Sequence, residues 1–594
     1  MQDIGTYRNG GNALPKGWWG VIAVAVAVVY FPSLHHAFQY DDVHSIVENY
    51  HVRSLANIDD FFWRADMFTA DPKGAMYRPL VLVSYAVNYA LGGYNVEGYR
   101  CFNIAVHLLN GLLVCHLLHR LTGVAAAGLA AGLLFSLHPI AGEPVNYISS
   151  RSESLAALFS LLSMALYIRA RESASSMVYI ASVVVFATAL LAKSMAIVLP
   201  LVLLFRDCST GGLSLQRIKA SGKYIVPFGL VATVYVIVVR QALATALVDR
   251  PVRGLWVQIL TQCKVLVYYL KLLLVPWGQN VEHQFALAKG WELSVLCALG
   301  LLVSMGWCLM LLWRRSPRLF FNFTWPIVFL LPTFVVPLNV LLNEHRLYIP
   351  AVSFAMLLGW LLTTRFSRWQ GLFLLAGLLL SYGALSLQRS LVWQTPETLW
   401  ADALQKAPRM PRPHLFIGDV YKGQGRTEEA LAAYQRALTV NPEILSGGDL
   451  LAIYNNTGAA YLSLGRNEEA IGWYRKALTI DPDYSKAREA LEGLTAIASW
   501  AWDEQVENIF KRAMQLLVTG RLDQALVELH RALSWQPHPK IYQAIGLAYE
   551  RSGQIEAAIE NYEAALALSD LPAGLEQGFR SKLAELKGER GHVE

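Results

Sequence analysis

Apolar segments long enough to cross a lipid bilayer recur through the first two-thirds of this 594-residue chain. With 55% hydrophobic residues, 16% charged residues and a mean hydropathy of +0.35, the chain has too few polar groups to cover a soluble globule of this size. Because a bilayer core requires about 20 residues per helix, we predict an all-α, polytopic bundle with eleven crossings. They lie at residues 17–35, 99–119, 123–138, 153–168, 176–192, 194–206, 224–243, 292–313, 322–341, 347–364 and 369–387.

A further apolar segment at 258–275 carries Gln262, Lys264 and Lys271 and is followed by Pro276. That composition is typical of an amphipathic helix at the membrane surface, so it is not counted as a crossing. Short cytoplasmic loops collect Lys and Arg, which fall here in alternate loops. The amino terminus is then inside, and the outer parts are the loops at 36–98, 139–152, 244–291 and 342–346 and everything after about residue 388.

The net charge of +6 is small for this length and falls largely in short loops, so nucleic-acid binding is not indicated. The six cysteines lie in or beside apolar segments without Cys-x-x-Cys or Cys/His spacing, which suggests neither a disulfide framework nor a zinc site. The loop charges are better explained as topology signals.

From Thr395 the composition changes to Ala, Glu, Gln, Arg and Tyr at helical spacing, and an internal repeat begins. Its two clearest copies start at Gly418 and Gly458 and share the pattern Gly-x2-Tyr-x3-Gly-x4-Ala-x3-Tyr-x2-Ala-x4-Pro. This pattern is typical of tetratricopeptide helix pairs, in which small residues let two helices touch and aromatic residues fill the gap. We predict a membrane domain at 1–394, with its first outer loop at 36–98, and an outer α-solenoid at 395–594 suited to an extended peptide.

Two adjacent carboxylates, Asp41 and Asp42, directly follow the first apolar segment. Placing carboxylates at the end of a membrane helix costs free energy, so such residues more often have a function than none. A single interfacial cation is usually a snorkelling anchor, but cations from four separate loops beside paired carboxylates indicate a site for an anionic head group. The predicted topology brings these further ionisable residues to outer helix ends: Arg78, His138, Glu143, Arg151, Glu153, Lys193, Glu344, His345 and Arg346.

Glycosyl transfer from a lipid phosphate is the chemistry that fits these groups. The acceptor hydroxyl needs a carboxylate base, which we assign to Asp41, with Asp42 orienting the base or the acceptor. The leaving phosphate needs cations to hold the departing charge. For this role we predict Arg78, Arg151, Lys193 and Arg346. We expect a supporting role for His138, Glu143, Glu344 and His345.

Two alternatives concern the acidic pair itself. The carboxylates could cap a helix or act as a topology signal, as we expect for the solvated pair Asp59 and Asp60 in the same loop. Together with His44 or Glu143, the Asp pair could also hold a divalent cation. Because the sequence contains no second, well-spaced acidic motif, we favour a site without metal or other cofactor.

Several short motifs, taken in order, resemble those of one family. They are Tyr40-Asp41-Asp42-x3-Ile46-x2-Asn49, Tyr77-Arg78-Pro79-Leu80, Asn103-x3-His107, Leu137-His138-Pro139-x3-Glu143-x-Val145, Arg151, Ala192-Lys193 and Glu344-x-Arg346-Leu347-Tyr348-x-Pro350. Followed by tetratricopeptide repeats, this order resembles the transmembrane and tetratricopeptide-repeat O-mannosyltransferases, multispanning GT-C glycosyltransferases related to protein O-mannosyltransferases. Two motifs depart from the family pattern: Lys193 is followed by Ser194 where Glu is common, and His345 stands between Glu344 and Arg346.

The resemblance implies a polyprenyl-phosphate sugar donor and inverting transfer of mannose or another hexose to Ser or Thr of an extracytoplasmic protein held by the repeats. It places Asp41 at the catalytic acidic position and Asp42 at its neighbour. The chain looks bacterial, so we expect it in a bacterial inner membrane, with the catalytic loops and repeats facing the periplasm. Three alternatives stay open: a non-catalytic repeat scaffold for a secretion or pilus machine, a transporter, and an enzyme of this fold with a lipid or glycan acceptor.

Overall fold

The computed structural model describes residues 15–70, 74–209, 215–246, 253–335, 340–499, 503–568, 571 and 573–590. Every regular element in these residues is a helix, which confirms the all-α prediction. The chain divides by packing into two compact units. We call Met1–Val420 with Thr439–Ser446 the membrane unit, and Tyr421–Leu438 with Gly447–Glu594 the repeat unit.

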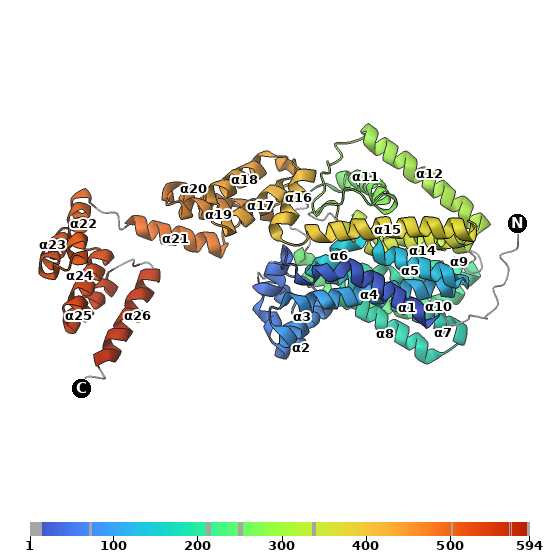
Figure 1. The fold of residues 1–594 in the computed structure, drawn as a ribbon, viewed down its shortest axis with the longest axis horizontal. Helices are drawn as coiled ribbons and strands as arrows, with labels where there is room; N and C mark the ends of the chain where they lie inside the picture. The colour runs from blue at the N-terminus through green and yellow to red at the C-terminus, as the bar shows by residue number, and fades with distance from the viewer. Residues whose placement is uncertain are drawn as a thin grey trace. The chain divides into compact units, whose positions relative to one another are not determined.

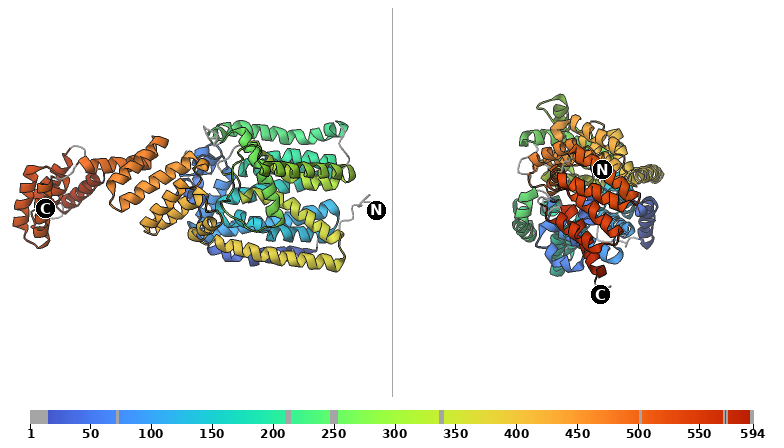
Figure 2. Two further views of the ribbon diagram at one scale, coloured as in Figure 1. Left: turned by 90° about the horizontal axis from the view of Figure 1, so that it is seen from above. Right: turned by 90° about the vertical axis from the view of Figure 1, so that its left-hand side faces the viewer.

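Long helices lying side by side make up most of the membrane unit (Figures 1 and 2). They are α1 (Lys16–Tyr30), α4 (Val96–Thr122), α5 (Ala125–Leu137), α7 (Arg151–Ser173), α8 (Ser176–Ala192), α9 (Leu199–Ser209), α10 (Leu215–Ala246), α11 (Leu255–Leu274), α12 (Leu293–Arg315), α13 (Pro317–Val335), α14 (Tyr348–Thr364) and α15 (Arg368–Val392). Shorter helices at one end of the bundle are α2 (Ile58–Phe61), α3 (Pro79–Gly92) and α6 (Gly142–Asn146).

By length and composition, eight helices of the described residues could cross a membrane, or nine if the bent pair α5–α6 is one span. They cover Gly17–His35, Val96–Thr122, Ile148–Ser173, Ile218–Arg240, Leu255–Leu274, Leu293–Arg315, Glu344–Thr364 and Arg368–Val392. The chain is thus a multi-pass membrane protein with fewer full-length spans than the eleven predicted. Four predicted spans are missing from the eight: α8 has only 17 residues and α9 only 11, α5 counts only in the bent pair, and α13 is not among them. The predicted span at 322–341 also includes residues 336–339, which lie outside the described residues. The helix α11, expected at the membrane surface, is among the eight.

Helix α5 lies at the centre of the bundle, packed on α1, α4, α14 and α15. Its second half, Ala130–Leu137, is entirely buried. Small residues allow this packing: a Cβ added at Gly359 of α14 would lie 2.7 Å from the backbone nitrogen of Ala131, and one at Gly128 would lie 2.6 Å from the backbone oxygen of Cys115. Backbones that approach so closely are typical of helix contacts in membranes, where small side chains drive association.

The repeat unit contains helix pairs of the predicted kind, among them α19–α20, α22–α23 and α24–α25. Gly458 faces Tyr474, and Gly546 faces Tyr562, so each small residue makes room for the aromatic ring of the partner helix. The turns inside these two pairs contain Gly465 and Gly553 in the left-handed conformation that glycine adopts without strain. The helices beyond α17 are α18 (Thr427–Thr439), α19 (Gly447–Ser463), α20 (Asn467–Ile480), α21 (Ser485–Ser499), α22 (Glu504–Val518), α23 (Leu522–Trp535), α24 (Pro539–Arg551), α25 (Ile555–Leu566) and α26 (Ala573–Arg590).

The first two helices after α15 pack with the membrane unit, although their composition is that of the repeats. They are α16 (Pro396–Lys406) and α17 (Pro411–Gly423). The segment after α1 meets the end of α15, since Ala37 N–H donates to the Gln394 carbonyl (3.1 Å) and the Gln39 amide to the Trp393 carbonyl (3.1 Å). The packing boundary therefore falls near residue 420, and the change in composition falls near 394.

Candidate functional site

The neighbouring carboxylates of the acidic pair have different surroundings. Asp42 is fully buried, and both of its oxygens are occupied. Its Oδ1 accepts from the backbone N–H and the hydroxyl of Ser149 (2.7 and 2.6 Å), and its Oδ2 accepts from the Gln39 N–H (3.0 Å). Burial raises the pKa of the Asp42 carboxyl, outweighing these hydrogen bonds and the charge of Arg100. Asp42 thus ties the loop after α1 to the segment before α7.

Asp41 keeps 41% of its side chain exposed. Its Oδ1 lies 3.2 Å from His44 Nε2, and its backbone N–H donates to the Tyr147 hydroxyl (3.2 Å). Burial raises the pKa of the Asp41 carboxyl, but His44, the Tyr147 hydroxyl and the charge of Arg412 outweigh it and hold the pKa below its ordinary value. The pKa of His44 is raised in turn, because its contact with Asp41 outweighs its own burial. The Asp41 carboxyl is therefore partly accessible to solvent, and its surroundings favour the ionised form.

The backbone before Asp41 has an uncommon conformation. Tyr40 has φ +48°, in the left-handed region that residues with a side chain rarely adopt. Such residues cost about 1–3 kcal/mol, cluster at functional sites and persist only when surrounding contacts hold them. The Tyr40 ring packs edge-on against Trp400 and Phe416, and its hydroxyl accepts a hydrogen bond from Arg412.

Three of the four predicted phosphate-binding cations are Lys193 and two arginines whose charges act on it. The ammonium of Lys193 is paired with the buried carboxylate of Glu153. Burial lowers the pKa of Lys193 to about 8; Glu153 opposes this shift, and the positive charges of Arg78 and Arg346 add to it. Arg78 also donates to the hydroxyl of Ser152 (3.3 Å). The Arg346 guanidinium donates to the carbonyls of Leu341 (3.3 Å) and Val340 (3.1 Å). We call Arg78, Lys193 and Arg346 the cationic cluster, because the charges of both arginines act on Lys193.

The structure places Arg151 elsewhere. Arg151 is fully buried and donates to Asn103 (2.7 Å), Ser84 (2.9 Å), Asn88 (2.8 Å) and the Tyr99 carbonyl (2.9 Å). These partners come from α3 and α4, so Arg151 joins both helices to α7. The geometry favours this structural role over the phosphate-binding role that the sequence predicts.

His138 also has structural contacts. Its Nδ1 accepts from the Ile140 N–H (3.1 Å) in the break between α5 and α6, and its Nε2 donates to the Leu273 carbonyl (3.1 Å). The two ring nitrogens are thus both occupied by backbone groups, and the residue caps the helix break rather than facing the cationic cluster.

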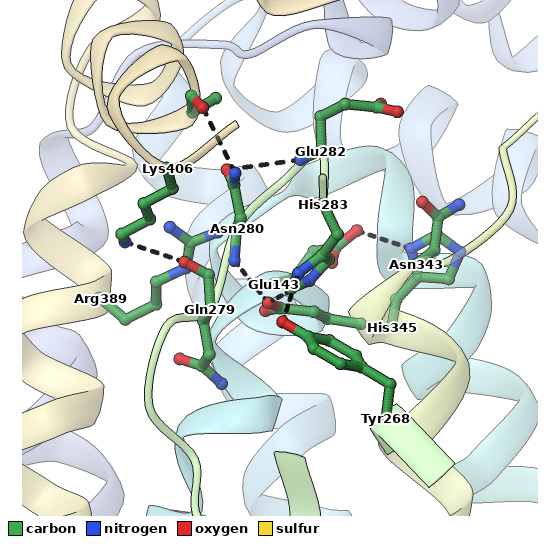
Figure 3. A network of polar contacts seen from close by, with 12 residues as sticks. Glu143, Tyr268, Gln279, Asn280, Glu282, His283, Asn343, His345, Arg389 and Lys406 are labelled. Carbon is green, nitrogen blue, oxygen red and sulfur yellow. Dashed lines mark hydrogen bonds and ion pairs between the residues drawn. The ribbon is translucent and has the colours of Figure 1, made fainter. Parts of the chain in front are cut away.

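The remaining predicted residues form a buried acid–imidazole network (Figure 3). His345 Nδ1 lies 2.6 Å from Glu143 Oε1, and its Nε2 lies 3.6 Å from Glu153 Oε1. His345 therefore links two carboxylates. Glu344 points to the loop between α11 and α12, where its Oε1 accepts from the Asn280 N–H (2.6 Å) and lies 2.8 Å from His283 Nε2.

The segment 149–153 contacts residues of the acidic pair, the cationic cluster and the acid–imidazole network. Ser149 holds Asp42, Ser152 contacts Arg78, and Glu153 contacts Lys193 and His345. Because a helix rises about 1.5 Å per residue, the backbone positions of Ser149 and Glu153 are only about 6 Å apart. The amino end of α7 and the residues just before it thus contact Asp42, Arg78 and Lys193.

Sequence reasoning missed several residues of this site. It gave no role to Tyr147, Ser149 or Arg412, and it treated the stretch around His283 only as part of an outer loop. Their contacts with Asp41, Asp42 and Glu344 join segments more than 60 residues apart in the chain. No local pattern carries such a signal. The only hint was Glu153, which the topology already placed at an outer helix end.

The described residues contain no group of three or more His, Cys, Asp or Glu arranged to hold a metal ion. The preference for a metal-free site over one built on the Asp pair and His44 or Glu143 stays a prediction, since no measurement of metal dependence bears on it.

Comparisons with known proteins agree with this organisation. Tetratricopeptide repeat models match residues 410–483 and 539–570. The chain is 31% identical to human protein O-mannosyl-transferase TMTC4 over 27% of its length, and 29% identical to Tmtc2 of Drosophila melanogaster over 47%. It is 24% identical to human TMTC3 over 74% of its length. The chain resembles the TMTC protein O-mannosyl-transferases. The resemblance read from its motifs is thereby confirmed.

These matches cover only part of each TMTC protein: 24% of TMTC4, 32% of Tmtc2 and 52% of TMTC3. Among solved structures, YrrB, described as a TPR protein with an unusual peptide-binding site, is 18% identical and covers 36% of this chain and 91% of its own length. Its TM-score of 0.17 gives this likeness no weight in the argument.

Proposed function

We propose that this protein is a membrane glycosyltransferase that moves a hexose from a polyprenyl-phosphate donor to Ser or Thr hydroxyls of an extracytoplasmic protein. The observation that carries the proposal is that the segment 149–153 contacts Asp42, the neighbour of the accessible carboxylate of Asp41, and also contacts Arg78 and Lys193 of the cationic cluster. An acceptor hydroxyl requires a carboxylate base, and a departing lipid phosphate requires cations. The similarity to TMTC proteins favours mannose as the sugar.

In the proposed reaction, the acceptor hydroxyl oxygen attacks the anomeric carbon while its proton passes to Asp41. The bond between that carbon and the phosphate oxygen breaks on the opposite face, so the configuration inverts. The electron pair of this bond leaves with the polyprenyl phosphate, whose charge is stabilised by Lys193, Arg78 and Arg346. Asp42, held by Ser149, fixes the loop that carries the base. No metal or other cofactor takes part.

The buried carboxylates of the network suit a sugar ring. The Oε2 atoms of Glu143 and Glu153 are buried, and neither has a hydrogen-bond partner among the described residues. A buried polar atom without a partner costs free energy, which a ligand that donates a hydrogen bond recovers. Sugar hydroxyls are such donors, so we assign the hexose to the side of the site lined by Glu143, Glu153 and His345.

The repeats would hold the acceptor polypeptide, as stacked helix pairs present concave surfaces to extended chains. For the location we keep the bacterial inner membrane, with the site and the repeats at the periplasmic side. Membrane lipid surrounds the bundle and delivers the prenyl-linked donor within the bilayer plane.

Replacement of the base tests the proposal. Purified full-length protein in lipid nanodiscs is given polyprenyl-phosphate mannose and a Ser/Thr-rich acceptor peptide. Asp41→Asn should lower transfer by roughly 10²- to 10⁴-fold, the usual contribution of a general base. Asp60→Asn, an exposed carboxylate of the same outer loop, is the matched control and should leave transfer unchanged.

Full transfer by Asp41→Asn would remove the assigned base. The repeat matches also support the second candidate, a non-catalytic scaffold. That function would be favoured if a strain carrying Asp41→Asn behaved as wild type while loss of the repeats reproduced the phenotype of a full deletion. Glycoproteomics of the deletion strain would identify the acceptor and its sugar.

A further inference from the structure

Arg412, at the start of α17, lies against the loop that carries Asp41. Its guanidinium donates a hydrogen bond to the Tyr40 hydroxyl and lies 5.7 Å from the centroids of the Tyr40 and Phe416 rings. It also lies 3.8 Å from the carboxylate of Glu282, in the loop between α11 and α12. One side chain of the first repeat helices therefore contacts two loops of the site.

Aromatic packing adds to this contact. Trp400 of α16 and Phe416 of α17 stack on each other with ring centroids 4.4 Å apart. The Tyr40 ring packs edge-on against both, at 5.5 and 4.7 Å. Tyr40 holds the uncommon left-handed backbone that precedes Asp41. A strained residue needs surrounding contacts to persist, and these rings and Arg412 supply them.

Helix α16 braces the neighbouring loop independently (Figure 3). The Lys406 ammonium donates to the Gln279 carbonyl (2.9 Å), and the Asn280 amide donates to the Ala403 carbonyl (3.4 Å). Asn280 is the residue whose backbone N–H is bound by Glu344. The first repeat helices thus reach the acid–imidazole network by a second route.

We propose that Arg412, with Trp400 and Phe416, positions Asp41 for catalysis, so that α16 and α17 are part of the catalytic machinery rather than the first piece of a separate peptide-binding domain. This inference rests on the proposed transferase function. It makes Arg412 a positioning residue, which acts through Tyr40 and through its charge.

Three titratable or charged groups from different elements face Asp41 and hold its pKa down. They are His44 of its own loop, Tyr147 from the turn after α6, and Arg412 from α17. Loss of the Arg412 charge therefore raises the pKa of Asp41 and moves the acid limb of the pH–rate profile to higher pH. A role confined to folding would not move this limb.

The test compares Arg412→Gln, Arg412→Lys and the control Arg409→Gln in the full-length protein. Arg409 is exposed and lies on the same segment, and its backbone N–H contacts Gln284. Hydrogen exchange followed by mass spectrometry reports on the 37–47 segment without any need for activity. We expect faster exchange there in Arg412→Gln, little change in Arg412→Lys, and wild-type exchange in Arg409→Gln.

The second part of the test measures the transfer kinetics of the same variants. Arg412→Gln should lower kcat by about ten- to hundredfold, as small misplacements of catalytic groups do, with KM for the donor nearly unchanged. Arg412→Lys, which keeps the charge, should restore the acid limb and part of kcat. Unaltered exchange in the 37–47 segment of folded Arg412→Gln would overturn the inference. A wild-type protein that transfers no sugar would instead refute the proposed function, and the exchange result would still decide the positioning role.

Discussion

The two units of this protein differ in whether their paired charged side chains are buried or exposed. In the membrane unit, Arg100 and Arg151 are fully buried and Glu153 and Glu344 are 1% exposed, each held by hydrogen bonds or ion pairs from distant segments. In the repeat unit, ion pairs such as Arg466–Glu469 lie on the surface between residues close together in the chain. Burying an ion costs several kcal/mol, whereas exposed pairs contribute little. The comparison is consistent with the proposed function, in which the first unit carries the chemistry and the second presents a binding surface.

Removal of a buried cation should have the largest effect after loss of the base. Lys193→Gln should lower transfer by roughly 10²- to 10³-fold, because the departing phosphate loses a charge-stabilising donor. The variant also leaves the buried Glu153 carboxylate without its ammonium partner, with only the 3.6 Å contact to His345, and loss of such a partner costs about 3–5 kcal/mol. The double variant Lys193→Gln/Glu153→Gln removes both charges and should recover the thermal unfolding midpoint but not transfer. Recovery of transfer as well would make the pair purely structural.

In the repeat unit, packing rather than charge should set stability. A Cβ added at Gly546 would lie 2.6 Å from the Tyr562 ring, so Gly546→Ala forces the two helices apart and should cost about 1–3 kcal/mol. Calorimetry of the full-length protein would measure the change. Gly578→Ala, in an exposed helical position with nothing within 4 Å of the added atom, is the control and should unfold at the wild-type temperature or slightly above. Equal behaviour of the two variants would contradict the packing explanation.

His44 gives a smaller effect, visible mainly in the pH dependence. The base works while Asp41 is ionised, and its lowered pKa places the acid limb of the pH–rate profile at lower pH than an ordinary aspartate would give. His44→Asn removes a hydrogen bond and a positive charge, so the pKa of Asp41 rises and the limb moves to higher pH. A pH–rate profile of both proteins would detect the shift. An unmoved limb would mean that His44 does not act on the base.

The smallest effect is expected on the surface of the repeat unit. Arg466→Ala removes the exposed cation just before α20 that is paired with Glu469. Because solvent screens this pair, neither the unfolding midpoint nor transfer should change measurably. A clear loss of stability or of transfer would contradict the expectation that exposed ion pairs of the repeat unit contribute little.

Much of the architecture was readable from the sequence, since hydrophobic length and repeat spacing are local signals. The site was only partly readable. Asp41 and Asp42 are adjacent and chemically identical, and only packing shows that one is enclosed by Ser149 and Gln39 while the other is accessible. Arg151 was predicted from charge and topology, but its acceptors converge from α3 and α4, which no short window of sequence brings together. Arg412 was hidden inside the repeat pattern for the same reason.

The imidazole of His345 leads to an expectation about related proteins. His345 joins Glu143 to Glu153, so three positions scattered along the chain form one chemical unit. A related chain without an imidazole at this position would have to separate or neutralise the two carboxylates, because nothing would lie between them. We therefore expect these three positions to covary across an alignment, and chains that keep the trio to share a preference for the same donor sugar.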